Sequence, residues 1–362
     1  MNKTKISAEI VADSLDSRGN RLTSLLITFP RIILAEINTH RMLSKNTSSS
    51  RAIPFKKMVE AIENDPFIPI AWQKEHKGMQ GTEYVTEPYE IENRRHAWIA
   101  SSYEAIKHAQ WLTNLNVTKQ LCNRLLEPFM WTTMLITGSK EGWDNFFELR
   151  CPSYLYDYED NPIYFKSKKE WVDYYNESQG YKENNPDFIK VESFTDLEWL
   201  KLNKGQAEIH MMTLAEAIYD AINESTPKQL ESGQWHIPFE SKMDIPSEQY
   251  INIANKIPLF TEDFTTIKLK TSVAMAARTS YTVVGEEKSI DYEKMIELHN
   301  RLIAQDPPHS SPLEHCARAM SEIEYTSCRT SKLAGKNGEY GWCGPYKGFI
   351  SYRYFIDNNL EV

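Results

Sequence analysis

Apolar and polar positions along the first sixty residues change spacing several times, and each spacing predicts a different element. Residues 22–29 (LTSLLITF) are rich in β-formers and predict a strand that Pro30 ends. Residues 31–38 predict a short helix that leads into a very polar stretch closed by Pro54. Residues 55–63 (FKKMVEAIE) carry apolar positions at helical spacing.

The next segment contains the longest helical pattern of the chain. Residues 64–92 are punctuated by Pro and Gly and are expected to be mostly loop. Residues 93–127 keep an apolar spacing of three to four, with a break at 114–116. The pattern therefore predicts one long helix and a second helix over 117–127 that ends at Pro128.

The middle of the chain combines two regular helices with an irregular, Tyr-rich segment. Residues 140–150 predict a helix, and 205–223 predict another. Between them, residues 151–203 are polar and punctuated by Asn and Pro, so we interpret them as an insertion with a short helix around 168–175, either a lid or a decoration. Residues 226–260 are expected to be irregular, and His236 within them to be structural.

The last hundred residues predict further helices and a closing strand. The amphipathic pattern over 291–304 predicts a helix, and 340–355 a Gly-hinged loop followed by a strand. The chain is therefore expected to fold as one α+β catalytic domain over 1–362, a central antiparallel sheet flanked by long helices, with 151–203 inserted in it.

Composition narrows the class of protein. The chain has 362 residues with 41% hydrophobic and 25% charged, typical of a globular protein with a real core. No apolar run is long enough for a membrane span, and the first twenty residues lack a signal core. Five scattered cysteines fit free thiols in a cytoplasmic protein. A net charge of −9 disfavours nucleic acid as a partner, so any anion site has to be a local cluster of Arg.

The polar stretch before Pro54 is the first candidate for such a cluster. His40 and Arg41 are followed by serines, Asn46 and Arg51, which offer hydroxyl, amide and guanidinium donors within a dozen positions. Guanidinium forks suit phosphate geometry, and small hydroxyl residues let backbone N–H groups approach an anion. A serine-rich solvated loop has the same composition, so the pattern alone leaves both interpretations open.

The spacing of these residues resembles a known signature. His40-Arg41-x-x-Ser44-x-Asn46-x-x-Ser49-x-Arg51 is similar to the Arg-His-Arg-x-x-Ser-x-Asn-x-x-Ser-x-Arg pattern of flavin-dependent thymidylate synthases. Further segments resemble motifs of the same family: Asn123–Pro128, Asn145–Arg150, Gly205–His210, Ser272–Tyr281 and His309–His315. In the family, the last two come before the Arg/Ser loop. The resemblance therefore implies the thymidylate synthase-complementing-protein-like fold with a circularly permuted order, as in a phage-like variant.

The resemblance also implies the chemistry. The expected activity is reductive methylation of dUMP to dTMP by FAD, with methylene-tetrahydrofolate and NAD(P)H as co-substrates, in a homotetramer with shared active sites. Catalytic roles are implied for Arg150, Ser49 and His309. Substrate contacts are implied for Glu36, Ser48, Ser49, Ser50, Arg51, Arg124 and Arg150. Cofactor contacts are implied for Thr39, His40, Arg41, Met42, Thr47, Asn145, His309, Ser311 and Glu314.

The chain departs from the family pattern at several positions, which keeps other products open. Thr39 stands at the first Arg, Glu36 at a Gln that touches the nucleotide, and Thr47 at an acidic residue. Ser139 and Glu141 replace an Asn and an Arg that reach the flavin or folate. A Glu beside a pyrimidine changes which hydrogen-bonding edge is accepted. Hydroxymethylation, or modification of dCMP, is therefore an alternative, and a non-enzymatic nucleotide-binding protein is a second one.

Five residues also have a competing interpretation. Cys151 follows Arg150 and could act as a nucleophile, but only Arg150 would lower its pKa, so a structural role is favoured. His309, Glu314 and His315 are plausible zinc ligands by type. Pro312 between them disrupts a helical ligand spacing, and we expect no metal. Arg124 could simply pair with Glu127 at the surface.

Overall fold

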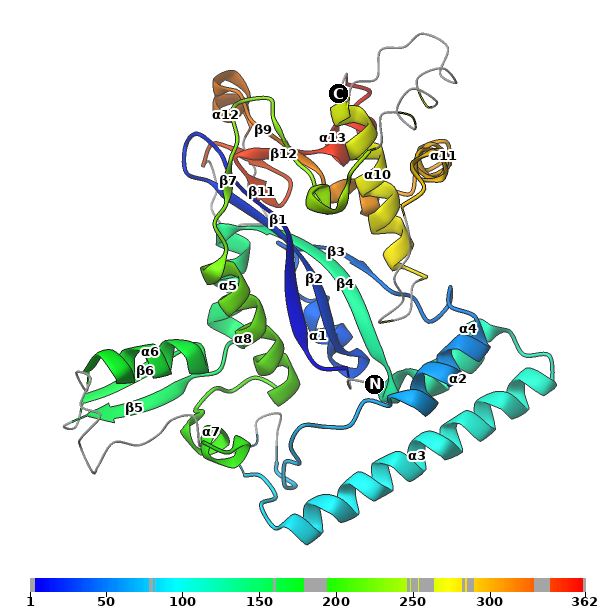
Figure 1. The fold of residues 1–362 in the computed structure, drawn as a ribbon, viewed down its shortest axis with the longest axis vertical. Coiled ribbons are helices and arrows are strands. Elements are labelled where there is room, and N and C mark those ends of the chain that lie inside the picture. Colours follow the sequence, from blue (N-terminus) through cyan, green and yellow to red (C-terminus); the bar gives the residue numbers. More distant parts are fainter. Residues whose placement is uncertain are drawn as a thin grey trace.

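The structure is a computed structural model that describes residues 4–77, 81, 83–158, 161–178, 194–245, 248, 253, 264–281, 284, 290–328 and 339–360. Its centre is a five-stranded sheet in the order β3-β4-β2-β1-β7 (Figure 1). The strands are β1 (Ser7–Leu15), β2 (Arg21–Pro30), β3 (Ser44–Thr47), β4 (Trp131–Ser139) and β7 (Lys228–Gln229). All neighbours pair antiparallel except β1 and β7, so the expected central antiparallel sheet is present.

Both faces of this sheet are covered, because its strands alternate apolar side chains between them. Leu25, Ile27 and Phe29 of β2 pack under α5 (Lys140–Arg150) and α8 (Ile209–Glu224). Leu26 and Leu135 face the opposite core, which contains α10 (Phe264–Thr279) and α11 (Tyr292–Ile303). Figure 1 shows these two helix pairs on either side of the strands.

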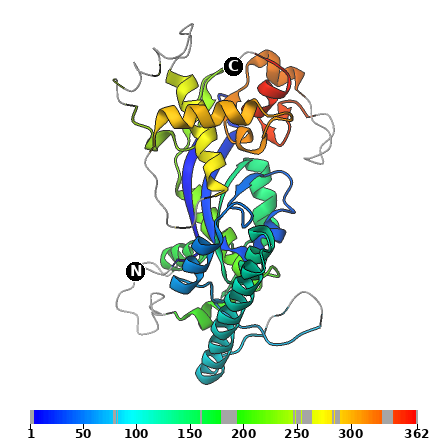
Figure 2. The same ribbon diagram turned by 90° about the vertical axis from the view of Figure 1, so that its right-hand side faces the viewer.

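A helical layer lies at the end of the sheet where β2 stops. It begins with η1 (Arg31–Ile33) and α1 (Leu34–Ile37). The other helices are α2 (Phe55–Asn64), α3 (Pro88–Asn114), α4 (Lys119–Cys122) and η2 (Asn123–Phe129). Ile53, Met58, Ala109 and Leu126 form a small core between them. Figure 2 shows α3 extending toward the end of the molecule opposite the C-terminal elements.

The described part of segment 151–203 forms a unit with its own aromatic core. It comprises β5 (Tyr154–Tyr158), β6 (Asn161–Phe165), α6 (Lys168–Ser178) and α7 (Asp196–Leu202). Tyr156, Trp171 and Trp199 pack together inside it. The unit is attached to α8 through Glu216, which accepts hydrogen bonds from the Tyr154 hydroxyl (3.0 Å) and the Lys168 backbone N–H (2.7 Å). The expected helix around 168–175 is confirmed, whereas the hairpin and α7 were not anticipated.

The C-terminal elements form a lobe beside the tip of the β1–β2 hairpin. They are η5 (Ser311–Glu314), β9 (Ala317–Ala319), α12 (Glu322–Ser327), β10 (Trp342–Cys343), β11 (Tyr346–Lys347), β12 (Phe349–Ser351) and α13 (Tyr352–Asp357). β12 and β9 form a three-stranded sheet with β8 (Trp235–His236), which follows α8 and precedes η4 (Glu240–Lys242).

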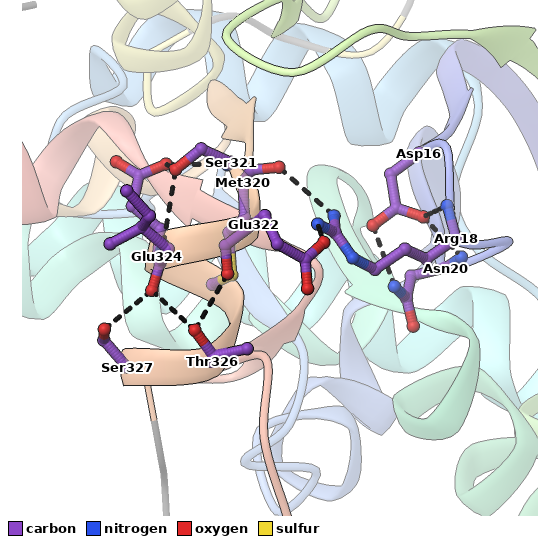
Figure 3. Close-up of polar contacts among 10 residues, drawn as sticks. Asp16, Arg18, Asn20, Met320, Ser321, Glu322, Glu324, Thr326 and Ser327 are labelled. Atoms are coloured by element: carbon purple, nitrogen blue, oxygen red, sulfur yellow. Dashed lines mark hydrogen bonds and ion pairs between the residues drawn. The ribbon is translucent and has the colours of Figure 1, made fainter.

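Hydrogen bonds fix the hairpin tip to this lobe (Figure 3). Asp16 closes the turn by accepting hydrogen bonds from the backbone N–H groups of Arg18 and Asn20, at 2.9 and 2.8 Å. The Arg18 guanidinium then donates to the Met320 carbonyl oxygen at 3.3 Å and pairs with Glu322. A turn near the start of the chain is thus attached to the start of α12, about three hundred residues away, through charged and carbonyl groups, and the Arg18 guanidinium also lies over the Tyr325 ring at 4.6 Å.

Several expected boundaries were wrong. Residues 44–47 form β3 within the stretch that was expected to be loop. Residues 88–92, expected to be loop, start α3. The second helix was expected over 117–127, but only Lys119–Cys122 is α-helical, and a 3₁₀ helix continues through Pro128.

Two further differences concern the helices α8 and α13. α8 begins at Ile209 rather than 205, because the Glu208 side chain caps it by accepting from the N–H groups of His210 and Met211. Residues 352–355, expected to be a strand, belong to α13.

Candidate functional site

The side chain of Asn46 joins the two segments that carry the sequence motifs. Asn46 lies on β3, and its Oδ1 accepts a hydrogen bond from Ser311 Oγ at 3.1 Å. Its amide also donates to the carbonyl oxygen of Ala276 on α10. Three residues further on, the Ser49 N–H donates to the Ser280 carbonyl oxygen at 2.7 Å. The polar loop, the end of α10 and the 309–315 segment are therefore in direct contact, although they are far apart in sequence.

A cavity of about 360 Å³ opens beside this junction. Arg41 and Ser44 from the polar loop and Glu314 from η5 line it, together with C-terminal residues that sequence reasoning did not assign. These are Cys343, Gly344, Pro345, Tyr346, Ser351, Arg353, Tyr354 and Asp357, with Leu43 from the loop. The volume is that of a small-molecule site, and its walls mix aromatic, apolar and charged groups as such sites do.

Charged side chains in this cavity are held by one another. Arg353 on α13 pairs with Glu314 at 2.5 Å and with Asp357 at 3.1 Å. Tyr346 donates its hydroxyl proton to the Glu314 carbonyl oxygen at 3.0 Å. α13 thus fixes the orientation of Glu314, a role that only its position in the fold reveals.

A second cluster surrounds the C-terminal end of α5. Arg150, the last residue of that helix, donates from Nε to His40 Nε2 at 3.0 Å. Its guanidinium also lies 4.0 Å from the Glu36 carboxylate. Burial, reinforced by the Glu208 carboxylate and opposed by Arg150, raises the pKa of Glu36. Burial, Arg150 and Lys45 lower the pKa of His40 to about 4, so its imidazole is neutral at physiological pH.

Lys45 lies between these two clusters and was not among the predicted residues. Its Nζ donates to the His40 carbonyl oxygen. Burial lowers the pKa of Lys45 to about 8, and the Glu314 carboxylate opposes that shift. A lysine inside a polar loop gives no sequence signal of burial, and the alternation of β3 gives none either, because its buried positions are Ser44 and Asn46.

The serines of the loop use their hydroxyl groups inside the protein. Ser48 Oγ bonds to Thr132 Oγ1 at 2.6 Å, and Ser50 Oγ donates to Glu127. Both serines are buried. Their assignment to substrate stays a prediction that these contacts do not favour. Ser49 is half-buried, and its carbonyl oxygen accepts from the N–H groups of Ala52 and Ile53.

Several predicted residues are exposed and lie outside the 360 Å³ cavity lining. They are Arg51, Arg124, Asn145 and His309. Glu127, the surface partner suggested for Arg124, instead pairs with Arg31 at 3.2 Å. Among the remaining cofactor candidates, Thr39 donates its hydroxyl to the Glu36 carbonyl oxygen, Thr47 pairs with Met134 in the sheet, and the Met42 carbonyl lies against Gly142. Their roles, like those of the exposed residues, stay predictions.

Two further buried histidines, His236 and His315, bond to hydroxyl side chains of the central sheet. His236 bonds to Ser14 Oγ and Ser24 Oγ, both at 2.8 Å, and Ser24 continues to Thr137 Oγ1 at 2.6 Å. His315 Nδ1 also bonds to Thr137 Oγ1, at 2.8 Å. Within the described residues, no group of three or more His, Cys, Asp or Glu is arranged to hold a metal ion.

Cys151 has the environment of a structural thiol. Its side chain is buried beside Phe147, and burial raises its pKa well above the ordinary value of a thiol. Lys166 opposes that shift, and Glu216 and other carboxylates add to it. A protonated buried thiol is a poor nucleophile. All five cysteines are free.

A second cavity, of about 430 Å³, lies between α2 and the start of β4. Its lining is mostly apolar, including Ile53, Met58 and Phe129, with Lys57 and Asp65 at polar positions. Ser48 is the one predicted site residue in this lining.

Of the helices in the described ranges, none has the length and apolarity that crossing a bilayer requires.

Comparisons with known proteins gave remote similarities only. No family model and no curated protein matches the chain. One similar solved structure is the UMP/dUMP methylase PolB from Streptomyces cacaoi bound with 5-Br dUMP, at 13% identity and a TM-score of 0.34, covering 49% of this chain and 89% of that one. Another is thymidylate synthase X from Helicobacter pylori with FAD and dUMP, at 16% identity and a TM-score of 0.27, covering 56% and 67%. Similarity at this level does not establish a common fold, so function is argued from the geometry of this chain.

Proposed function

We propose that this chain is a flavin-dependent enzyme that modifies a pyrimidine nucleotide, with reductive methylation of dUMP to dTMP as its reaction. One observation carries the proposal: Asn46 bonds to both Ala276 and Ser311, which joins the polar loop to the two segments that complete the resemblance. A site that is built from all three segments requires them to lie in contact. NAD(P)H, methylene-tetrahydrofolate, the homotetramer and the permuted order belong to the proposal as consequences of the resemblance.

The cavity beside the junction fits part of a flavin by its chemistry. Arg41 offers a cation at its rim, and the partly exposed Tyr354 offers an aromatic ring. Arg353 holds Glu314 in place as a hydrogen-bond acceptor. Bound there, a reduced flavin would supply a hydride and the folate a one-carbon unit. The residues around the cavity would bind these ligands, orient them and exclude water.

Arg150 is the residue that would act on the pyrimidine. Its guanidinium stays charged at any working pH and would stabilise negative charge that develops on a ring oxygen. It is one-quarter exposed, so a ligand can reach it. Because Cys151 is buried and protonated, a mechanism that needs no protein nucleophile agrees better with this site than one that begins with thiolate addition.

The environment of Glu36 favours a second candidate. Its carboxyl group lies beside Arg150 and has a raised pKa. A carboxylate accepts a hydrogen bond from the exocyclic amino group of cytosine, and a protonated one donates to a carbonyl. The alternative is therefore modification of dCMP, or a hydroxymethyl rather than a methyl product, by the same arrangement.

Purified protein tests the proposal directly. We expect a yellow protein with the absorbance of oxidised flavin, and release of tritium from 5-tritiated dUMP when NADPH and methylene-tetrahydrofolate are added. Release from 5-tritiated dCMP instead would support the alternative, and mass spectrometry of the product separates methyl from hydroxymethyl. A colourless protein that binds dUMP but takes up no added FAD would contradict both enzymatic proposals.

A further inference from the structure

The group that accepts the closest side-chain hydrogen bond of Arg150 is an uncharged imidazole rather than a carboxylate. Arg150 Nε donates to His40 Nε2, a neutral imidazole nitrogen, at 3.0 Å. The carboxylate that faces the same guanidinium, Glu36, is at 4.0 Å and is partly exposed. Arginine–carboxylate pairs are frequently bidentate, and such a carboxylate orients the guanidinium and also neutralises its charge. Here the closer and more buried partner is uncharged.

A neutral acceptor orients a guanidinium without neutralising it. The imidazole lone pair fixes the Nε–H direction, and the full positive charge stays available to another group. His40 can do this because its imidazole does not take up a proton at neutral pH: burial, Arg150 and Lys45 all lower its pKa. Phe146 packs edge-on against the ring at 4.9 Å between centroids, which restricts its rotation.

The backbone of His40 is held from both sides. Its N–H donates to the Ile37 carbonyl oxygen at 3.2 Å, and its carbonyl oxygen accepts from Lys45 Nζ and, at 3.4 Å, from the Leu43 N–H. The Glu314 carboxylate favours the charged form of Lys45, and Arg353 pairs with that carboxylate. The groups that face His40 are therefore Arg150 from α5, Lys45 from β3 and Phe146, and none of them offers it a negative charge.

We infer that His40 is a positioning residue for Arg150, which presents its guanidinium charge to the pyrimidine with Glu36 held off at 4.0 Å, and that Lys45 fixes the His40 backbone for this purpose. The catalytic consequence rests on the proposed function. The resemblance implies a different role, contact with the flavin, and the two roles predict opposite results for flavin affinity.

Two substitutions of His40 separate these roles. His40→Phe keeps a ring against Phe146 and removes the acceptor, whereas His40→Gln keeps an acceptor oxygen at about the place of Nε2. We expect His40→Phe to lower kcat on the order of 10²-fold, since misplaced catalytic groups cost about that much, with the flavin Kd unchanged. His40→Gln should restore most of the loss. A flavin Kd that rises as far as kcat falls, or an unchanged kcat, would overturn the inference.

A measurement without turnover keeps the inference independent of the proposed reaction. In protein labelled with ¹⁵N at arginine Nε, the Arg150 Nε–H signal should be protected from exchange with water, and it can be assigned by its loss in Arg150→Lys. In His40→Phe its exchange should become about 10- to 100-fold faster, as expected for a lost hydrogen bond to a charged group. If wild type shows this protection but binds no flavin, the proposed function fails while the positioning contact stands. If exchange is equally fast in wild type and His40→Phe, the positioning contact itself is wrong.

Lys45→Met tests the part of the inference that concerns Lys45. Methionine keeps the length and apolar stem of the side chain and removes the side-chain donor to the His40 carbonyl oxygen, while the Leu43 N–H still donates to it. We expect a smaller loss of kcat than in His40→Phe, on the order of tenfold, with faster exchange at Arg150 Nε as well. A loss of kcat with unchanged exchange would show that Lys45 acts on the ligand directly and would refute its part of the inference.

Discussion

Individual residues decide what the candidate site can do, and Arg150 is the clearest case. Its charge lies at the end of a helix, beside a neutral acceptor at 3.0 Å and a carboxylate at 4.0 Å. Lysine would keep the charge but lose the planar fork. We expect Arg150→Lys to lower dUMP turnover about 10²- to 10³-fold, the usual cost of removing one preorganised group that stabilises developing charge. Tritium release measures the loss, and the flavin absorbance of the same sample checks that the cofactor is still bound. Turnover within a few-fold of wild type would remove Arg150 from the chemistry.

Substitution of Cys151, the residue after Arg150, should by contrast leave turnover unaffected. Cys151 is buried, and its raised pKa keeps it a thiol. Cys151→Ala should therefore leave turnover unchanged and lower the free energy of unfolding by about 1–2 kcal/mol, through lost packing. Activity assays together with urea unfolding measure both effects. Complete loss of activity in a folded Cys151→Ala protein would point to thiolate chemistry.

Sequence reasoning identified several residues of this site but not their partnerships. His40 and Arg150 were both expected near ligands, yet nothing in the pattern indicated that one orients the other across 110 positions. Lys45, Tyr346 and Arg353 were missed, because a lone Lys or Arg in a polar or Tyr-rich segment is typical of solvated surface. Only the packing of β3, β11 and α13 shows that Tyr346 is buried and that Lys45 and Arg353 reach His40 and Glu314.

At the scale of the element, β3 holds the halves of the site together through Asn46. Asn46→Ala would leave the Ala276 carbonyl oxygen and the Ser311 hydroxyl without this partner. We expect a cost of about 2–4 kcal/mol in the free energy of unfolding, since two groups at a buried junction lose a hydrogen bond. The midpoint of urea unfolding at constant slope measures it.

Ser311→Ala is the matched control for this substitution. It removes one donor from the same junction and keeps the bond from the Asn46 amide to Ala276, so we expect about 1 kcal/mol. Equal costs for the two variants would mean that the Ala276 contact contributes nothing.

The insertion offers a pH-dependent prediction at the same scale. Burial is the largest cause that raises the pKa of Glu216, whose carboxyl group joins α8 to β5 and α6. A carboxyl group with a raised folded pKa favours folding while it is protonated, and this contribution is lost as pH rises through the folded pKa. Glu216→Gln is uncharged throughout and keeps one acceptor and one donor. The stability of wild type relative to Glu216→Gln should therefore fall as pH rises from about 4, the ordinary pKa of a glutamate, through the raised pKa of Glu216 in the folded protein. Thermal unfolding across that range measures it, and a constant difference would contradict the shift.

The elements themselves were predicted where local signals were sufficient. α5 and α11 have clear amphipathic patterns and recognisable first residues, and both were placed within a residue or two. α13 was mistaken for a strand because Tyr352, Tyr354 and Phe355 favour β structure by propensity. The Ser351 side chain, which accepts from the Tyr354 N–H, caps a helix there instead. β3 was missed because its four polar residues form a strand only through pairing with β4.

At the scale of the whole molecule, the attachment of the hairpin tip to the C-terminal lobe depends on Gly348. Its φ is +79°, and a Cβ atom there would lie 2.4 Å from Asp16 Oδ2 and 2.7 Å from Asn20 Cβ. Gly348→Ala should therefore cost about 3 kcal/mol or more, from backbone strain plus a clash. Chemical denaturation measures the cost, and loss of flavin binding at lower denaturant than in wild type would locate it in the lobe.

Gly233 provides the comparison, because its φ is +86° and a Cβ atom would meet nothing within 4 Å. Gly233→Ala should cost only the strain of a left-handed backbone, about 1–2 kcal/mol. If both substitutions cost the same, close packing between Gly348 and the hairpin is not what holds the lobe.

The separation between Asn46 and Ser311, 265 positions, also orders events while the protein is being made. At roughly 5–20 residues per second, translation delivers the second partner tens of seconds after the first. The early strands can pair with one another in that interval, but the edge of β3 has to wait beside the ribosome without its final neighbours. Nascent chains of this protein should therefore stay catalytically silent until η5 emerges, and chaperones that shield open strand edges should speed its maturation more than its later refolding.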